Sequence, residues 1–461
     1  MNPDSTFRST LANLGWPAFP APLAANKLAL LFQIEQNQWR TPEQIAASQL
    51  DQIRQVVAFA AATVPHYRRE LGARFQIGEL TPKNWHEIPV LTRKAVYDAT
   101  AELKSERIPG EHGRTFPLKT SGSTGMVVEV MGTELTSLFW QVFCLRDHLW
   151  HRRDLREKLC AIRFQRDPAL KGAAGVQAQG WGPATDDVVM TGPSVTYDIL
   201  QDVAYLAERL AIEHPGYVLG HPSMILGLAR HCLDRGILLP DLREVRTLGE
   251  SPDESLREYA LKAWNAPVVD MYTCQEAGYL ALQCPEHTHY HVQSENVFLE
   301  VVDDGGRPCK PGEIGRVLIT SLNNFATPLI RYELGDYAEV GEACSCGRGL
   351  PVLKRILGRY RNLLTLPDGS RRWTLIGYPT DIAPIEEMQL IQTGLKEVQV
   401  RLVMPRTLDD SEANALTTYI HGNAGYPFEL RFEYVDSIRS SVNGKVEQVI
   451  SLIEPERQSN Q

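Results

Sequence analysis

Between residues 190 and 300, short apolar runs alternate with amphipathic stretches, and this alternation limits the possible folds more than any other feature of the sequence. The apolar runs are "GYVLG" (216–220), "EVRTLGE" (244–250) and "PVVDMY" (267–272), and the stretches between them are "ILGLARHCL" (225–233) and "SLREYALKAW" (255–264). Strands that alternate with helices form parallel sheets whose faces the helices cover. The sequence therefore predicts an α/β layer with a substantially parallel sheet.

Two helices are predicted before this region. Thr41 is a suitable N-cap, Pro42 suits the first helical position, and Gln44 completes a capping box. Apolar residues then recur at helical spacing as far as Pro65. The segment "EIPVLTRKAVYDAT" (88–101) predicts a second helix, capped by Thr92.

Two further blocks follow the α/β region. The first is a predicted β-hairpin, in which "ENVFLEVV" (295–302) and "GRVLITS" (315–321) flank the turn "DDGG". The second lies beyond Gly358 and contains a strand-like, a helix-like and another strand-like segment: "EVQVRLVM" (397–404), "DDSEANALTTYIH" (409–421) and "PFELRFEY" (427–434). In the last segment four apolar residues alternate onto one face: Phe428, Leu430, Phe432 and Tyr434.

The predicted fold class is therefore α/β, in two domains. A large N-terminal domain with α/β layers and the hairpin region covers residues 1–357, and its helical lead-in covers about residues 1–105. A small C-terminal α+β domain covers residues 358–461; the family resemblance described below implies a hinge near residues 358–361. Two or three domains are what a chain of 461 residues requires, because single cores stop growing well below that length.

Composition excludes several classes of protein. A net charge of −9 argues against a nucleic-acid partner, which requires a basic surface. We expect no membrane association, because no apolar run approaches the length of a membrane-spanning helix, and the first residues lack a secretory pattern. Eight cysteines in such a long chain favour a reducing cytoplasm over a disulfide framework.

The stretch "KTSGSTGMVVEV" (119–130) is rich in small polar residues and has two interpretations. Such a run can be a flexible linker. It can also be a loop whose amides and hydroxyls bind phosphate oxygens. It lacks the Gly-Lys-Ser/Thr ending of a P-loop, so a phosphate site here would depend on hydroxyls more than on a lysine.

Two carboxylates and a lysine are the next candidates, each with a structural alternative. Glu276 follows a predicted strand, where a carboxylate can hold Mg²⁺ on a triphosphate or can simply be solvated. Asp336, in "PLIRYELGD" (328–336), can accept ribose hydroxyls or cap a Gly-Asp turn. Lys445 follows an Asn-Gly turn and is either a solvated side chain or a mobile positive charge for a reaction centre.

Cysteines and histidines gather at the two ends of the predicted hairpin. "CPEHTHYH" (284–291) precedes it and "CSCG" (344–347) follows it. Thiolates and imidazoles are the ligands that Zn²⁺ prefers, and four of them form a closed, structural site. The sequence therefore predicts a zinc ion that joins the ends of the hairpin, over residues 284–346; the alternative is unrelated thiols beside a polar loop.

The order of these motifs resembles the adenylate-forming superfamily of acyl-CoA synthetases, nonribosomal adenylation domains and luciferases. Within it, the chain looks most like the phenylacetate–CoA ligase family. The segments that carry the resemblance are "TVPHYRREL" (63–71), "IPVLTRK" (88–94), "TSGSTG" (120–125), "VLGHPS" (218–223), "LGES" (248–251), "CPEHTHYHVQSENVFLEVV" (284–302), "PLIRYELGD" (328–336), "CSCGRGLPVLKRILGR" (344–359) and "VNGKVEQV" (442–449). The resemblance covers roughly residues 41 to 450.

The resemblance implies a set of ATP-binding residues. Those implied for the β- and γ-phosphates are Thr120, Ser121, Gly122, Ser123, Thr124 and Gly125. Those implied for the adenine site are Gly249, Glu250, Ser251, Asp270, Met271, Tyr272 and Thr273, with Tyr272 against the base. Asp336 would bind the ribose hydroxyls, and Arg359 would steady the ribose and the α-phosphate.

The resemblance also implies catalytic and metal-binding residues. Glu276 would bind Mg²⁺, and Lys445 would bridge the substrate carboxylate and the α-phosphate. A structural Zn²⁺ would be held by four residues, Cys284, His291, Cys344 and Cys346, with His287 and His289 as alternatives to His291. The acyl site would be lined from the region of residues 139–148 and from residues 217–250, which include Trp140, Tyr217 and His221.

The implied activity is ATP- and Mg²⁺-dependent conversion of a carboxylic acid, of the aryl class, to an acyl-AMP and then to a CoA thioester. The sequence departs from the family where Met126 follows the phosphate loop, where Gln275 precedes Glu276, and where "GRYRN" (358–362) lacks an acidic hinge residue. Transfer to an amine, a hydroxyl or a carrier protein is therefore the alternative, and a catalytically silent, zinc-containing binding module is a third. Family members are often dimers, so a homodimer stays open.

Overall fold

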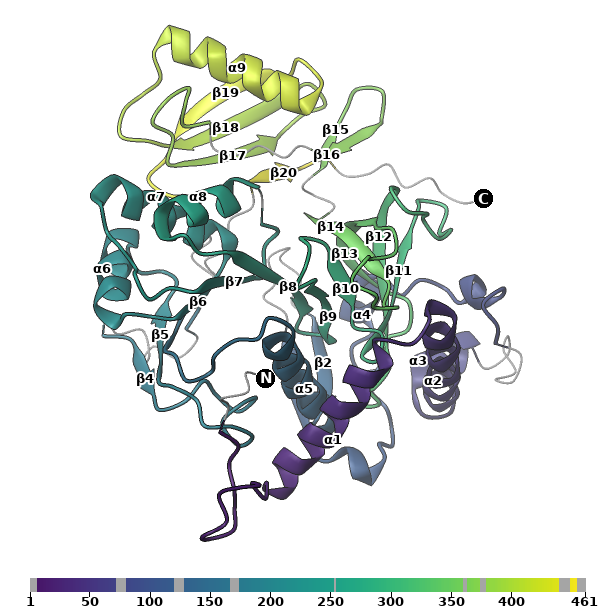
Figure 1. Cartoon of the computed structure of the whole chain (residues 1–461). Helices are drawn as coiled ribbons and strands as arrows, with labels where there is room; N and C mark the ends of the chain where they lie inside the picture. The colour runs from purple at the N-terminus through teal and green to yellow at the C-terminus, as the bar shows by residue number, and fades with distance from the viewer. Residues whose placement is uncertain are drawn as a thin grey trace.

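The computed structural model describes residues 6–71, 80–119, 128–165, 174–252, 254–359, 363–373, 379–438 and 448–453. Figure 1 shows a large mixed α/β body and a small C-terminal sheet covered by one helix. The helices of the described part are α1 (Pro22–Asn37), α2 (Pro42–Thr63), α3 (Pro65–Leu71), α4 (Arg93–Asp98), α5 (Glu134–Trp150), α6 (Val203–Glu213), α7 (Pro222–Arg235), α8 (Glu254–Trp264) and α9 (Asp410–Ala424).

A twelve-stranded sheet forms the centre of the large body. Its strands, in spatial order, are β11 (Val297–Val302), β12 (Ile314–Ser321), β13 (Tyr332–Val340), β14 (Val352–Arg359), β10 (Tyr290–Val292), β9 (Gly278–Gln283), β8 (Val268–Cys274), β7 (Glu244–Leu248), β6 (Tyr217–Gly220), β3 (Leu159–Arg163), β5 (Ser194–Asp198) and β4 (Val176–Ala178). The run from β8 to β5 is parallel, as the alternating sequence predicts. The strands beyond β8 are antiparallel.

Helices cover both faces of the parallel strands, as expected for an α/β layer. One face packs on α6, α7 and α8, where Leu210, Met224 and Leu256 are buried. The other face packs on α1 and α5, where Leu31 and Phe143 are buried. Figure 1 shows α5 in front of the sheet, and the helices α6 to α8 beside its parallel half.

The capped helices of the lead-in form where the sequence predicts them. The Thr41 side chain accepts from the Gln44 amide, and the Gln44 side chain accepts from the Thr41 amide, so the capping box is complete. Thr92 caps α4 by accepting from Ala95. This helix has only six residues, Arg93–Asp98, and is therefore much shorter than the segment 88–101 that predicted it.

The predicted hairpin forms from β11 and β12, which pair antiparallel. The Gly335–Asp336 step, in contrast, is not a turn, because both residues lie inside β13. The pairing of β12 with β13 shifts register just there, and Gly335 has φ +84°, in open space where a Cβ would meet nothing within 4 Å. A glycine is therefore required here by the positive φ and not by a lack of space. Gly335 belongs to a β-bulge, which changes the direction of the following side chain.

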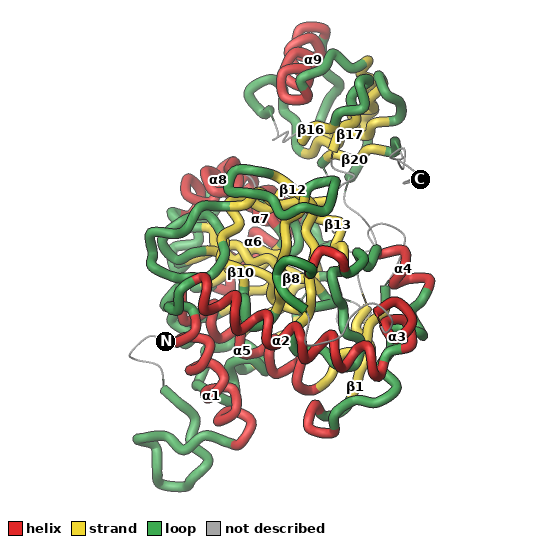
Figure 2. The backbone as a smooth tube through the Cα atoms, turned by 90° about the vertical axis from the view of Figure 1, so that its right-hand side faces the viewer, coloured by secondary structure: helices red, strands yellow, loops and turns green. Residues whose placement is uncertain are grey.

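The C-terminal domain contains a four-stranded sheet, ordered β19 (Glu429–Tyr434), β18 (Glu397–Val403), β17 (Glu387–Gln392) and β20 (Val449–Ser451). The helix α9 packs on it through Leu416 and Ile420. Leu430 and Phe432 are partly buried there as predicted, but Tyr434 is 42% exposed because it ends its strand. In Figures 1 and 2 this domain lies at one end of the molecule.

Two short hairpins complete the described strands: β1 (Thr115–Lys119) with β2 (Glu129–Thr133), and β15 (Leu363–Thr365) with β16 (Arg371–Trp373). Among the described residues, no helix combines the length and the apolar character needed to cross a bilayer.

Candidate functional site

Two residues that are predicted to bind the nucleotide lie together, one at the carboxyl end of β8 and the other on β13. The Tyr272 hydroxyl donates to Asp336 Oδ2 at 2.8 Å, although 64 residues separate them in the chain. Ligands of open α/β sheets bind beside the carboxyl ends of the strands. The tyrosine ring and the carboxylate therefore lie at the sheet edge where a nucleotide is expected.

Glu276 lies in the turn between β8 and β9, and it is 5% exposed. Arg93 Nη1 donates to Glu276 Oε1 at 3.2 Å and to the Tyr332 hydroxyl at 3.2 Å. The Tyr332 hydroxyl donates to the same Glu276 oxygen at 3.4 Å. This buried carboxylate is therefore held in one position by a cation and a phenol, as a metal-binding or phosphate-facing group requires.

Arg93 and Tyr332 are members of this site that sequence reasoning missed. Arg93 opens the short helix α4, and the isolated bridge between Leu91 and Tyr332 places that helix start beside β13. The contact joins residues 183 positions apart. A single sequence carries no signal for a contact between residues so far apart in the chain. The Thr92 cap indicated only where the helix that carries Arg93 begins.

The residues around Asp336 define the geometry of the proposed ribose site. In the pairing of β13 with β14, Asp336 lies opposite Arg359, and Tyr337 lies opposite Gly358. Gly358 has φ +86°. The main chain of the predicted hinge therefore begins at a position adjacent to Asp336.

The residues expected around the adenine follow β7 or belong to β8. Glu250 Oε2 accepts from the Ser223 amide at 3.0 Å, and Glu250 Oε1 is 3.7 Å from His221 Nδ1. Gly249 (φ +83°), Glu250 and Ser251 follow β7; Met271 and Thr273 belong to β8, with Met271 buried in the core under α5. These residues gather at one edge of two neighbouring parallel strands.

Asp270 differs from the other residues expected around the adenine because both of its carboxylate oxygens accept hydrogen bonds from buried protein side chains. Thr247 Oγ1 donates to Asp270 Oδ1 at 2.6 Å, and the Tyr290 hydroxyl donates to Asp270 Oδ2 at 2.8 Å. Burial raises the pKa of Asp270 to about 7. Its carboxyl group therefore stabilises the junction of β7, β8 and β10, and only its main chain lies along the edge that a ligand would approach.

The residues expected around the acyl group are divided between two places. Trp140 packs edge-on against Tyr279, with ring centroids 5.3 Å apart, and His221 follows the carboxyl end of β6. Tyr217 begins β6, at the opposite edge of the sheet, and its hydroxyl accepts from the Asp154 amide at 2.9 Å. Trp140 and His221 are therefore placed to meet a ligand at the carboxyl edge, and Tyr217 is not.

Two predicted groups lie outside the described residues: the loop from Thr120 to Gly125, and Lys445. Their roles remain predictions from the sequence.

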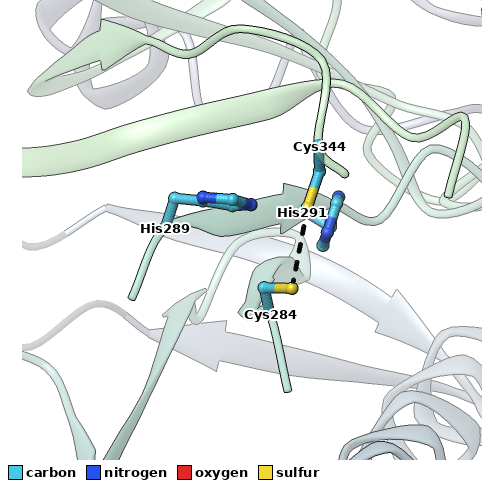
Figure 3. Close-up of side chains that lie close together, drawn as sticks. All are labelled: Cys284, His289, His291 and Cys344. Atoms are coloured by element: carbon cyan, nitrogen blue, oxygen red, sulfur yellow. Dashed lines mark hydrogen bonds between the residues drawn. The ribbon is translucent and has the colours of Figure 1, made fainter. Parts of the chain in front are cut away.

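Cysteines and histidines that flank the β11–β12 hairpin in the sequence gather into one cluster, which joins the β9–β10 segment to the connection between β13 and β14. The ligand atoms of Cys284, His289, His291 and Cys344 all lie within 4.8 Å of one another. Figure 3 shows the two imidazole rings beside the thiols of Cys284 and Cys344, which lie 3.9 Å apart. Cys346 Sγ lies 3.4 Å from His291 Nε2 and so borders the same cluster.

The geometry of this cluster fits a tetrahedral metal ion. A Zn–S bond of about 2.3 Å places two thiolates of a tetrahedron about 3.8 Å apart, close to the 3.9 Å between Cys284 and Cys344. Nε2 of His289 and Nδ1 of His291 are buried and have no hydrogen-bond partner among the described residues. The exposed His287 instead contacts Ser345 Oγ at 3.0 Å, so it is the least suitable of the three histidines.

A bound cation would change the ionisation of the thiols in this cluster. Burial raises the pKa of Cys344 to about 12, so without a cation its thiol stays protonated. A bound metal would deprotonate it. The amides of Glu286 and Cys346 already point at the sulfurs of Cys284 and Cys344, at 3.5 and 3.4 Å, and would stabilise thiolates.

Comparison with known proteins supports the resemblance seen in the sequence. Residues 379–452 match the CapK C-terminal domain family. Phenylacetate–coenzyme A ligase of Thermus thermophilus is 29% identical over 198 residues, 41% of this chain and 43% of the relative. Protein CapK of Staphylococcus aureus is 25% identical over 262 residues, 53% of this chain and 55% of the relative. The chain thus matches about half the length of these curated relatives.

Solved structures extend the likeness to nearly the whole chain. A 2-hydroxyisobutyryl-CoA ligase in the postadenylation state, in complex with R3-HIB-AMP, superposes with a TM-score of 0.68 over 90% of this chain and 91% of that one, at 16% identity. The chain has the fold of the adenylate-forming CoA ligases. An anthranilate CoA ligase in complex with anthranoyl-AMP, with a TM-score of 0.52, covers 72% of this chain and 64% of its own. The predicted fold class and the predicted family resemblance are both confirmed.

Proposed function

We propose that this chain activates a carboxylic acid with ATP, forming an acyl-AMP and pyrophosphate, and then transfers the acyl group to CoA. The observation that carries the proposal is the hydrogen bond between Tyr272 and Asp336 beside the buried Glu276, at the edge where α/β folds bind ligands. The likeness to phenylacetate–coenzyme A ligase supports the type of reaction.

The nucleotide would be held along β8 and β13. Asp336 would accept the two ribose hydroxyls, and the Tyr272 ring would lie against the base while its hydroxyl keeps Asp336 oriented. Arg359, opposite Asp336 in the sheet, would steady the ribose and the α-phosphate. The loop from Thr120 to Gly125 would donate to the β- and γ-phosphates.

The first chemical step joins two anions, the substrate carboxylate and the α-phosphate. Positive charge must therefore lie where negative charge develops. Lys445 would supply it at the new bond, and Arg93, held beside Glu276, would supply it toward the leaving pyrophosphate. Glu276 would hold Mg²⁺, which neutralises pyrophosphate when bound.

The Cys/His cluster would hold a structural Zn²⁺. Cys284 and Cys344 fit best as two ligands, and His291 as a third. His289 and Cys346 compete for the fourth position, since each borders the cluster. Four protein ligands leave no open position, so the ion would join the β9–β10 segment to the β13–β14 connection and take no part in catalysis.

The acyl acceptor has two candidates. CoA is favoured by the likeness to CoA ligases. The departures from the family pattern at Gln275 and in "GRYRN" (358–362), however, keep an amine, a hydroxyl or a carrier protein as the alternative acceptor. In either case we place the boundary between the domains at residues 357–358, with the hinge at 358–361. A cytoplasmic location fits eight free thiols.

Titration of ATP by calorimetry tests the nucleotide site. Asp336→Asn should raise the Kd for ATP about 10- to 100-fold, the range for a hydrogen bond to a charged group. Asp304→Asn, in the exposed turn between β11 and β12, is the matched control and should leave the Kd unchanged. An unchanged Kd in Asp336→Asn would remove the basis of the proposal.

A further inference from the structure

A cationic side chain lies at the carboxyl edge of the parallel strands and is not used by the chemistry above. Arg163 is the last residue of β3. Leu159 and Ala161, which share its side of the strand, are buried against α5, whereas Arg163 is exposed. Because side chains alternate along a strand, Arg163 projects on the α5 side of the sheet, just beyond the buried core.

The sheet topology makes this edge a ligand site. From β3 the chain passes to β5 on one side, and then returns past β3 to β6, β7 and β8 on the other. The strand order therefore switches between β3 and β6. Ligands of open α/β sheets bind at the carboxyl ends on either side of such a switch point. Arg163 ends one of the two strands, and His221 follows the other.

Arg163 is exposed to solvent yet enclosed by protein. Burial lowers its pKa, and the charges that also act on it come from Tyr279, Arg246 and Cys144. Tyr279 and Arg246 are themselves buried. Arg163 therefore keeps accessible surface although buried side chains surround it.

Among the described residues, the charge of Arg163 has no carboxylate partner. Arg246 donates to Asp147, and Arg153 donates to both Asp147 and Glu244, so these carboxylates already serve two guanidinium groups. Among the residues that the structure describes, the Arg163 side chain has no ion pair or hydrogen bond. The carboxylate that follows β7, Glu250, is bound to the Ser223 amide and lies beside His221.

The position of Arg163 also separates it from the nucleotide. Tyr272 lies on β8, and β7 and β6 lie between β8 and β3. Three strand spacings amount to about 14 Å. This distance separates the main chains of β3 and β8. The Arg163 side chain shares the α5 side of the sheet with Tyr279 and Trp140, whereas Tyr272 packs in the core on the other side.

We propose that Arg163 binds a second anionic group of the acid substrate, so that the chain prefers acids with a further carboxylate over simple monoacids. The proposal rests on the proposed adenylation activity and names its substrate class. A guanidinium presents paired donors that match a carboxylate. The partly buried ring of Trp140, held in place by the buried Tyr279, would pack on the body of the acid between its two charged ends.

Acid-dependent exchange of labelled pyrophosphate into ATP tests the proposal with matched acids: benzoate against isophthalate and terephthalate, and butyrate against glutarate. The dianionic member of each series should exchange with the higher kcat/KM. Arg163→Gln should lower the ratio of dianionic to monoanionic kcat/KM about 10- to 100-fold, and Arg163→Lys should lower it less. Arg243→Gln, at the amino edge beside β7, is the matched control and should keep the ratio.

The outcomes are distinguishable. Exchange with monoacids but not with their dianionic partners, or a preference that survives in a folded Arg163→Gln protein, would overturn the inference and leave the proposed function intact. An absence of exchange with every acid, from a protein that still binds ATP, would overturn the proposed function and the inference with it. Thermal unfolding followed by circular dichroism establishes that each variant is folded.

Discussion

Replacing Asp147 by Asn should destabilise the large domain, because this carboxylate holds two buried arginines. Asp147 Oδ2 accepts from Arg153 Nη1 at 2.6 Å and from Arg246 Nη2 at 2.7 Å, and none of the three side chains is more than 4% exposed. Asparagine keeps the shape and one oxygen acceptor but loses the charge. The only other carboxylate on Arg153 among the described residues is Glu244, at 2.6 Å.

The magnitude follows from this burial. Removing one partner of a buried ion pair costs about 3–5 kcal/mol, because it leaves a buried charge without compensation. At about 2 °C per kcal/mol for a large domain, the thermal midpoint should fall by roughly 6–10 °C. The exposed pair of Glu258 and Lys262, one helical turn apart, supplies the control, and Glu258→Gln should cost at most about 0.5 kcal/mol.

The assay is urea denaturation of both variants and the wild type across pH. Burial alone would raise the pKa of Asp147, but the charges of Arg153 and Arg246 outweigh it and hold that pKa well below the usual range. The stability that this carboxylate contributes is therefore present above the pKa of an unfolded aspartate, about 3.9, and is lost as the pH falls below it. The gap between wild type and Asp147→Asn should narrow below about pH 4. A loss under about 1 kcal/mol at pH 7 would refute the reasoning.

Two further predictions concern residues with assigned chemical roles. Lys445→Ala should abolish acyl-AMP formation while ATP binding is largely kept, since the lysine acts on the charge that develops during the reaction; retained adenylation in a rate assay would contradict that role. Purified protein should contain about one zinc ion per chain, and Cys284→Ala should lose the ion and lower the thermal midpoint, whereas Cys309→Ala, outside the cluster, should do neither; metal analysis that finds far less than one zinc would reject the site.

Features set by neighbouring residues could be predicted from the sequence. The capping box of Thr41 and Gln44 and the Thr92 cap depend on groups three residues apart, and both form. The alternating strands and helices between 190 and 300 likewise carry their pattern locally, and the parallel strands form in that order. Periodicity and capping chemistry therefore suffice for the elements and for the α/β layer.

Features that depend on contacts between distant parts of the chain could not be predicted from the sequence. The Gly335–Asp336 step has the composition of a turn, but pairing with β12 makes it a bulge within β13. The pairing of Arg93 with Glu276 joins segments that meet only in the folded sheet. The motif spacing indicated a Cys/His cluster, but whether His289 or Cys346 completes it depends on side-chain geometry and not on the order of residues.

The most direct test of the account is acid-dependent exchange of labelled pyrophosphate into ATP, across aryl and aliphatic acids, first without CoA and then with it. The account predicts exchange with at least one acid in the absence of CoA, and AMP release that rises when CoA is added. Exchange without any CoA-dependent product would assign the acyl group to another acceptor. No exchange with any acid, from protein that binds ATP, would contradict the central claim that this chain forms acyl adenylates.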